Sequence, residues 1–262
     1  MFSSGSYKAQ TMKLFFLLII NFFTLSIFSQ QNTSNAVIDY KEYNNTETPN
    51  TLTSTLSVHN STTIFLAKFS TQKFNNPKEE ADRPNRKTQD TDYLKIDHKN
   101  KELLSVEPFE ANYILVKDEY PNLKWDISQE EKVIGKYKCI KATTTYRGKD
   151  WLVWFTPEIP LNYGPWKLHG LPGLIVEATD STNTFSWAVE KIEFRKDPVF
   201  DMDFNTLVKV KNKTPVTKRK LLDDMDEYQA NLEAQMKQLM PDMGTPIHTR
   251  TGYELKYEWE TK

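Results

Sequence analysis

The chain of 262 residues contains a single cysteine, Cys139. One cysteine excludes an internal disulfide, a cysteine-based zinc site and a lipid-bearing cysteine just after a signal peptide. Stability must therefore come from packing. Cys139 lies in a β-prone segment, which predicts a buried, inert thiol rather than a nucleophile.

The sequence also lacks any block of basic residues. Its 34 Lys and Arg are interspersed with 35 Asp and Glu, which gives a formal net charge of −1. Proteins that track nucleic-acid phosphates concentrate their positive charge, so this pattern argues against a nucleic-acid partner.

Recognisable catalytic motifs are missing as well. The four histidines form no HExxH motif or closely spaced pair: His59, His98, His169 and His248. No serine lies in a G-x-S-x-G elbow, and no glycine-rich loop could cradle a phosphate. We therefore assign no catalytic residue, metal or cofactor. One enzymatic alternative stays open, a hydrolase or metal-dependent enzyme in which His169 works with Glu158 and Glu177.

The N-terminus has the order of a secretory signal peptide. Lys13 precedes a mostly apolar run over residues 14–28, and the small Ser29 stands just before Gln30. The run is shorter than the roughly 20 apolar residues that span a bilayer, and a polar stretch follows it. We interpret residues 1–30 as the signal peptide and Met12 as the start. The remaining chain is expected in the periplasm or outside the cell, soluble, without a membrane span and not as a lipoprotein.

Residues 31–92 predict a poorly ordered or insertion-rich segment. The stretch is rich in Asn, Thr and Ser as far as Thr63 and has little apolar content. Residues 36–40 and 64–69 could each form an edge strand, and residues 75–91 resemble a long charged loop.

Residues 93–262 predict one β domain. Short β-prone segments follow one another, separated by turn signals: residues 93–97, 113–117, 136–146, 151–155, 174–179 and 185–194. Connections as tight as the one around Gly148 require antiparallel neighbours. In the last segment the apolar residues change face, which predicts a bulge near Lys191.

One helix is expected over residues 218–240, capped by Thr217 and stopped by Pro241. Its apolar residues recur at helical spacing: Leu221, Leu222, Met225, Tyr228, Leu232, Met236, Leu239 and Met240. We expect this stripe to pack on the sheet, although a methionine-rich face could also bind a partner. The tail from residue 245 predicts a last strand or a surface tail. The fold class is mainly β (α+β): an antiparallel curved sheet or half-open barrel, with one C-terminal helix on its concave side.

The most unusual stretch is residues 156–175, TPEIPLNYGPWKLHGLPGLI. Four prolines and three glycines lie between two strand signals, which predicts a fixed loop. Pro172 and Gly173 suit the two central positions of a type II turn, where the second needs a positive φ.

Residues 170–175 spell GLPGLI, and the chain resembles the GLPGLI family of exported proteins, known mainly from Bacteroidota. The resemblance runs from about Tyr93 to Phe194 and includes the TPEIP loop. The residues that carry it as a structural motif are Gly164, Pro165, Gly170, Leu171, Pro172, Gly173, Leu174 and Ile175. It implies export and an envelope location, but the family has no known function and no catalytic residues to carry over.

Aromatic residues beside the rigid loop are the candidates for binding. Trp154, Tyr163, Trp166 and His169 could line a pocket for an apolar or mixed small ligand, or contact an envelope protein. The same rings could instead fill the core. The leading hypothesis is an exported, non-catalytic module that binds a ligand or partner; a structural surface protein without a pocket is the further alternative.

Overall fold

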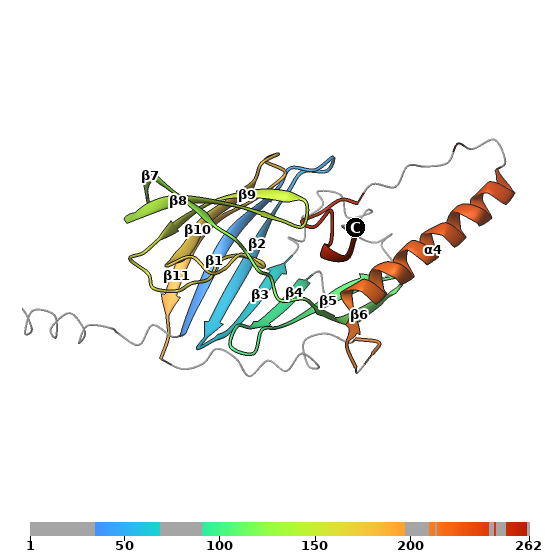
Figure 1. The fold of residues 1–262 in the computed structure, drawn as a ribbon, viewed down its shortest axis with the longest axis horizontal. Helices are drawn as coiled ribbons and strands as arrows, with labels where there is room; N and C mark the ends of the chain where they lie inside the picture. Colours follow the sequence, from blue (N-terminus) through green and yellow to red (C-terminus); the bar gives the residue numbers. More distant parts are fainter. Residues whose placement is uncertain are drawn as a thin grey trace, which may run out of the picture. The chain divides into compact units, whose positions relative to one another are not determined.

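The sheet has 12 strands in the order β12-β6-β5-β4-β3-β2-β1-β11-β10-β9-β8-β7 (Figure 1). Every neighbouring pair is antiparallel except β12 and β6, which are parallel, so the sheet is mixed. The prediction of a mainly β fold is confirmed, and the parallel pair is an addition to it. The strands are β1 (Asn35–Asn44), β2 (Asn50–His59), β3 (Thr62–Lys68), β4 (Thr91–Asp97), β5 (Glu102–Phe109), β6 (Asn112–Asp118), β7 (Asp126–Ile134), β8 (Tyr137–Tyr146), β9 (Lys149–Thr156), β10 (Leu174–Asp180), β11 (Phe185–Phe194) and β12 (Val216–Thr217).

This computed structural model describes residues 35–68, 91–196, 210–212, 214–240, 244 and 250–260. All of them belong to the unit Ser34–Lys262. The expected signal peptide, most of the charged loop over residues 75–91, Pro241 and His248 lie outside the described residues.

Strand β1 lies inside the sheet, between β2 and β11, and β3 lies between β2 and β4, so the prediction of edge strands at residues 36–40 and 64–69 is wrong. Ala36, Ile38 and Tyr40 are fully buried. The expected bulge is confirmed, because Asp39 pairs with Lys191 whereas Tyr40 pairs with Val189.

Strand β2 was missed because its apolar content is thin. Leu52, Leu56 and Val58 face the core, while Thr51 and Thr53 are exposed on the other side. An antiparallel sheet with one solvated face needs apolar residues at alternate positions only, and threonine suits the outer face. A Thr-rich stretch that resembled a loose segment is therefore a regular strand.

Strands β9 and β11 contribute large side chains to the core. Trp151, Val153 and Phe155 point to the same face of β9 and are fully buried, and the rings of Trp151 and Trp187 lie 5.5 Å apart between centroids. Cys139 is also fully buried, and burial raises the pKa of its thiol, as expected for an inert cysteine.

The helix α4 (Lys218–Leu239) begins where predicted, with the Thr217 side chain accepting a hydrogen bond from the Lys220 N–H at 3.2 Å. Its apolar stripe packs on the sheet only towards its N-terminal end, where the ring of Tyr228 still contacts that of Phe109 in β5, with 6.0 Å between centroids. Leu221 is buried against the sheet, but Met225, Tyr228, Met236, Leu239 and Met240 are between 40% and 80% exposed. The helix lies against the end of the sheet formed by β5, β6 and β12 and then extends away from it (Figure 1), so the C-terminal part of its apolar stripe has no sheet beneath it.

The C-terminal segment, defined here as residues 250–260, forms no strand. It ends in the 3-10 helix η1 (Glu258–Glu260) and packs on the β8–β9 turn. The N–H groups of Leu255 and Lys256 donate to the carbonyl of Arg147 at 2.8 and 3.0 Å. Tyr257 is 4% exposed, so the alternation in this tail reflects anchoring rather than a strand.

Candidate functional site

The GLPGLI motif makes a tighter turn than predicted. The Gly173 N–H donates to the carbonyl of Leu171 at 2.8 Å, two residues back, as in a γ-turn. The type II turn is therefore wrong, and the need for glycine has another cause. A Cβ on Gly173 would lie 2.1 Å from the carbonyl oxygen of Thr156, so the end of β9 occupies the space of a side chain.

A second close approach folds the loop back on the strand. A Cβ on Gly164 would lie 2.7 Å from the Cβ of Ile175, and the Ile175 N–H donates to the carbonyl of Tyr163 at 3.0 Å. Two residues after Gly164, Trp166 has a φ of 54°. A bulky residue in the left-handed region is held there by its surroundings at some cost in strain.

The four candidate binding residues lie in three different places. Trp166 lines a cavity. Tyr163 and His169 join a cluster of rings with His98 and Tyr120. Trp154 is half-buried on the other face of β9, where the ammonium of Lys132 lies 4.4 Å from its ring centroid.

His169 contacts rings rather than carboxylates. Its Nδ1 lies 2.9 Å from the carbonyl of Lys167 and therefore carries the proton, since a carbonyl can only accept. The centroids of its ring and those of His98 and Tyr120 are 4.9 Å apart, and Tyr163 lies 4.5 Å from His98. Burial lowers the pKa of His169 and lowers that of His98 to about 3, so both imidazoles are neutral.

The carboxylates of the enzymatic alternative have other partners. Glu158 accepts a hydrogen bond from the Lys138 N–H at 2.7 Å, and Glu177 pairs with Lys132 at 2.5 Å. None of the hydrogen bonds and ion pairs seen for them in the described residues involves His169. Within those residues, no group of three or more His, Cys, Asp or Glu is arranged to hold a metal.

The cavity beside Trp166 has a volume of about 250 Å³. Its apolar walls come from β3, β4, β5, the motif loop and the C-terminal segment: Phe65, Tyr93, Leu94, Val106, Pro108, Trp166, Tyr253 and Tyr257. Polar side chains also line it: Ser105, Glu107, Lys167, Lys218, Thr251 and Glu254. Segments from residue 65 to residue 257 thus meet around one cavity.

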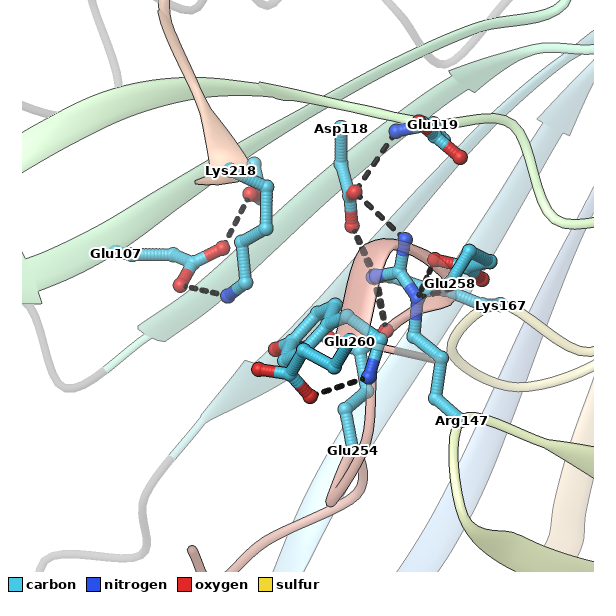
Figure 2. A network of polar contacts seen from close by, with 11 residues as sticks. Glu107, Asp118, Glu119, Arg147, Lys167, Lys218, Glu254, Glu258 and Glu260 are labelled. Carbon is cyan, nitrogen blue, oxygen red and sulfur yellow. Dashed lines mark hydrogen bonds and ion pairs between the residues drawn. The ribbon is translucent and has the colours of Figure 1, made fainter. Parts of the chain in front are cut away.

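A buried ion network supports one wall (Figure 2). Arg147 binds Asp118 through two N–H···O contacts of 2.7 and 2.9 Å and Glu254 at 2.8 Å. Lys167 binds the same two carboxylates at 2.7 and 2.5 Å. The side chains of Arg147 and Asp118 are 0% and 1% exposed, so both charges depend on these contacts.

Burial by itself would raise the pKa of Asp118, but Lys167 and Arg147 outweigh it and hold that pKa well below its usual range. The pKa of Glu254 is lowered in the same way. Both carboxylates are therefore ionised at neutral pH. A second pair, Lys218 with Glu107, lies at another side of the cavity, and Glu107 also accepts from the Ser105 hydroxyl at 2.8 Å.

The buried carboxylate of Glu42 binds the side chain of Tyr253, which lines the cavity. It is fully buried and accepts hydrogen bonds from the Trp187 indole, at 2.8 Å, and from the Tyr253 hydroxyl. Burial raises its pKa, although these hydrogen bonds oppose the rise. The folded state therefore keeps this proton to a higher pH than the unfolded state.

A stability measurement should detect this group. A raised folded pKa means that stability falls as pH rises from the unfolded value, about 4.3, through the folded value. We expect Glu42→Gln, which cannot ionise, to lose less stability over that range in urea unfolding experiments. The lowered pKa values of Asp118 and Glu254 act at lower pH and do not mask the effect. The exposed Glu47→Gln should keep the wild-type profile; an unchanged profile in Glu42→Gln would contradict the assignment.

Comparison with known protein families gives a match in the region of the motif. Residues 149–177 match a family described as a protein of unknown function (Porph_ging). This span contains β9, the motif loop and the first half of β10, including residues 170–175. The match does not test membership of the GLPGLI family, which stays a prediction. No curated protein matches the chain.

Solved structures give weak similarities. Two crystal forms of PNGF-II are each 16% identical, with TM-scores of 0.46 and 0.47, over 70% and 72% of this chain. The chain spans only about a third of PNGF-II, 31% and 32% of its length. A domain from Vibrio parahaemolyticus, described as an outer membrane lipoprotein-sorting protein domain, is 9% identical, with a TM-score of 0.25 over 68% of this chain and 91% of that one.

Sequence reasoning found Trp166 but missed most of the cavity. Lys167 of the cavity, Asp118 and Arg147 of the ion network and His98 of the ring cluster carry no local pattern that marks them, because their partners lie up to 111 residues away. No helix in the described part of the chain is long and apolar enough to cross a bilayer.

Proposed function

We propose that this protein is an exported, non-catalytic module of the cell envelope that binds a small ligand in the cavity beside Trp166. The observation that carries the proposal is the cavity itself: about 250 Å³, walled by aromatic rings, by a buried ion pair and by a partly buried one. Ligand sites characteristically combine apolar walls with a few fixed polar groups. A structural protein without a pocket has no need of this arrangement.

The resemblance to the GLPGLI family and the signal-peptide pattern of residues 1–30 support export and an envelope location. The half-open barrel also belongs to the proposal. Asp118 at the end of β6 contacts Arg147 in the β8–β9 turn, although these strands are far apart in the strand order. Such a contact supports a sheet that curves around the cavity.

A thermal-shift screen tests the proposal. The probes are neutral saccharides, amino acids and dipeptides, and medium-chain fatty acids. At 100 times its dissociation constant, a ligand that binds only the folded state adds about 2.7 kcal/mol, which raises the melting temperature of a chain of this size by roughly 5–10 °C. We expect at least one class to do so.

The location is tested by filling the cavity. Thr251 is exposed at its edge, so Thr251→Trp should place an indole in the cavity without disturbing the core. The shift should disappear in this variant and persist in Thr53→Trp, a matched control on the solvent face of β2. A shift that survives Thr251→Trp places the ligand elsewhere, and the absence of any shift contradicts the proposed function.

A further inference from the structure

The walls of the cavity point to one class of ligand. We infer that it accepts a neutral saccharide ring, with the apolar face of the ring on the aromatic side chains and its hydroxyl groups on the ion pairs. This inference rests on the proposed function and specifies its ligand.

The charges that line the cavity are balanced. Two cations and two anions face the cavity: Lys167, Lys218, Glu107 and Glu254. Behind them, Arg147 is balanced by Asp118. Because every charge already has an opposite partner, the walls hold no surplus to neutralise an ionic ligand in a desolvated site. A phosphate or a free carboxylate therefore has no counter-charge here.

The pair of Lys218 and Glu107 retains free hydrogen-bonding capacity. A lysine ammonium carries three N–H donors, and in the described part of the chain Lys218 donates to one carboxylate, that of Glu107. The Lys218 side chain is only 10% exposed, so its remaining donors face little solvent. Glu107, at 24%, is the more exposed partner and can accept further hydrogen bonds. An apolar ligand would leave these groups unsatisfied.

Aromatic rings lie close to the charged groups of the cavity. The Lys167 ammonium lies 5.4 Å from the ring centroid of Trp166, and the Lys218 ammonium lies 5.8 Å from that of Tyr257. Each ion pair thus adjoins an aromatic ring. A pyranose has the matching chemistry, because its C–H groups are attracted to the negative face of an aromatic ring. Its hydroxyl groups both donate and accept, so one of them can bridge a lysine and a glutamate.

Other compact ligands fit less well. An amino acid is neutral overall, but each of its charges would have to compete with an existing pair such as Lys167 and Glu254, which are 2.5 Å apart. A hydroxyl group can join such a pair without separating it. The volume of about 250 Å³ corresponds to roughly eight water molecules at 30 Å³ each, enough for one sugar ring. We therefore assign the cavity to a single monosaccharide or the terminal unit of a glycan.

Saturation-transfer difference NMR on the purified chain tests the inference, with neutral methyl glycosides as probes. We expect saturation to be strongest on the C–H protons of one ring face of a bound glycoside. Glu107→Gln should weaken binding about tenfold or more, since a hydrogen bond to a charged acceptor is lost. Glu102→Gln is the matched control, because Glu102 lies on the same strand, is 56% exposed and is outside the cavity. Its affinity should equal that of the wild type.

The outcomes separate this inference from the proposed function. If amino acids or fatty acids bind in a manner lost in Thr251→Trp while no glycoside binds, the cavity binds a ligand but the saccharide assignment is overturned. If a glycoside binds equally well to wild type and Thr251→Trp, the assigned location is overturned. If no probe of any class binds, both proposals fail. Thr251→Trp also guards against misreading a folding defect in Glu107→Gln, because it blocks the cavity without removing a buried charge.

Discussion

Gly173→Ala is expected to lower the free energy of unfolding by about 3 kcal/mol or more. The added Cβ would lie 2.1 Å from the carbonyl oxygen of Thr156 and 2.6 Å from its carbonyl carbon, and both atoms belong to the backbone. Neither can move without breaking the pairing of β9 with β10, which begins at Thr156 and Leu174. Forcing an extra methyl group into a close-packed site costs about 1–3 kcal/mol, and more where the surroundings cannot adjust. Urea unfolding monitored by circular dichroism measures the loss.

The matched control is Gly135→Ala in the β7–β8 turn. Gly135 has a φ of 58°, and a Cβ added to it would meet no other atom within 4 Å. Its substitution carries only the backbone cost of the left-handed region, about 1 kcal/mol. If Gly173→Ala is no more destabilising than Gly135→Ala, the close approach to Thr156 does not explain the glycine of the motif.

Arg147→Met is expected to destabilise the protein by about 3–5 kcal/mol. Removal of one partner from a buried ion network leaves an uncompensated charge, because Asp118, whose side chain is 1% exposed, and Glu254 then share Lys167 as their one remaining cation in the network. The variant keeps the backbone geometry, so the positive φ of residue 147 contributes equally in both proteins. The C-terminal segment also loses its contacts with the guanidinium through Glu254 and Glu258. Limited proteolysis should therefore cut this segment faster than in the wild type.

Two further variants show whether the effect comes from the buried charge. The double variant Arg147→Met with Asp118→Leu should recover most of the lost stability, because Lys167 and Glu254 remain paired. The exposed Arg195→Met, which breaks a surface pair with Glu193, should cost less than about 1 kcal/mol. Equal losses in Arg147→Met and Arg195→Met would mean that the network contributes no more than a surface salt bridge.

The features that the sequence predicted correctly are local ones. The start of α4 follows from the capping residue Thr217 and the helical spacing after it. The β8–β9 hairpin follows from Gly148, and the bulge in β11 from the change of face near Lys191. In each case a few consecutive residues contain the whole pattern.

The features that could not be predicted depend on distant partners. The local pattern of a strand does not show how many neighbouring strands it has, so the sequence could not place β1 between β2 and β11. The apolar stripe of α4 indicates a helix, but it does not say where the sheet beneath it ends. Arg147 resembled an ordinary turn residue, because its carboxylate partners lie 29 residues before it and 107 and 111 residues after it.

The position of the ion network has a consequence for how the sheet holds together. The strand order consists of two meanders, β1 to β6 and β7 to β11, and the β1–β11 ladder is the only seam of backbone hydrogen bonds between them in the described residues. Asp118 belongs to the first meander and Arg147 to the second, and the C-terminal segment is tied to both of them through the network. The contact is therefore a non-covalent cross-link at a second point. The two meanders cannot separate at the β1–β11 ladder unless the buried charges of Asp118 and Arg147 are also separated and exposed. We therefore expect the two meanders to unfold together.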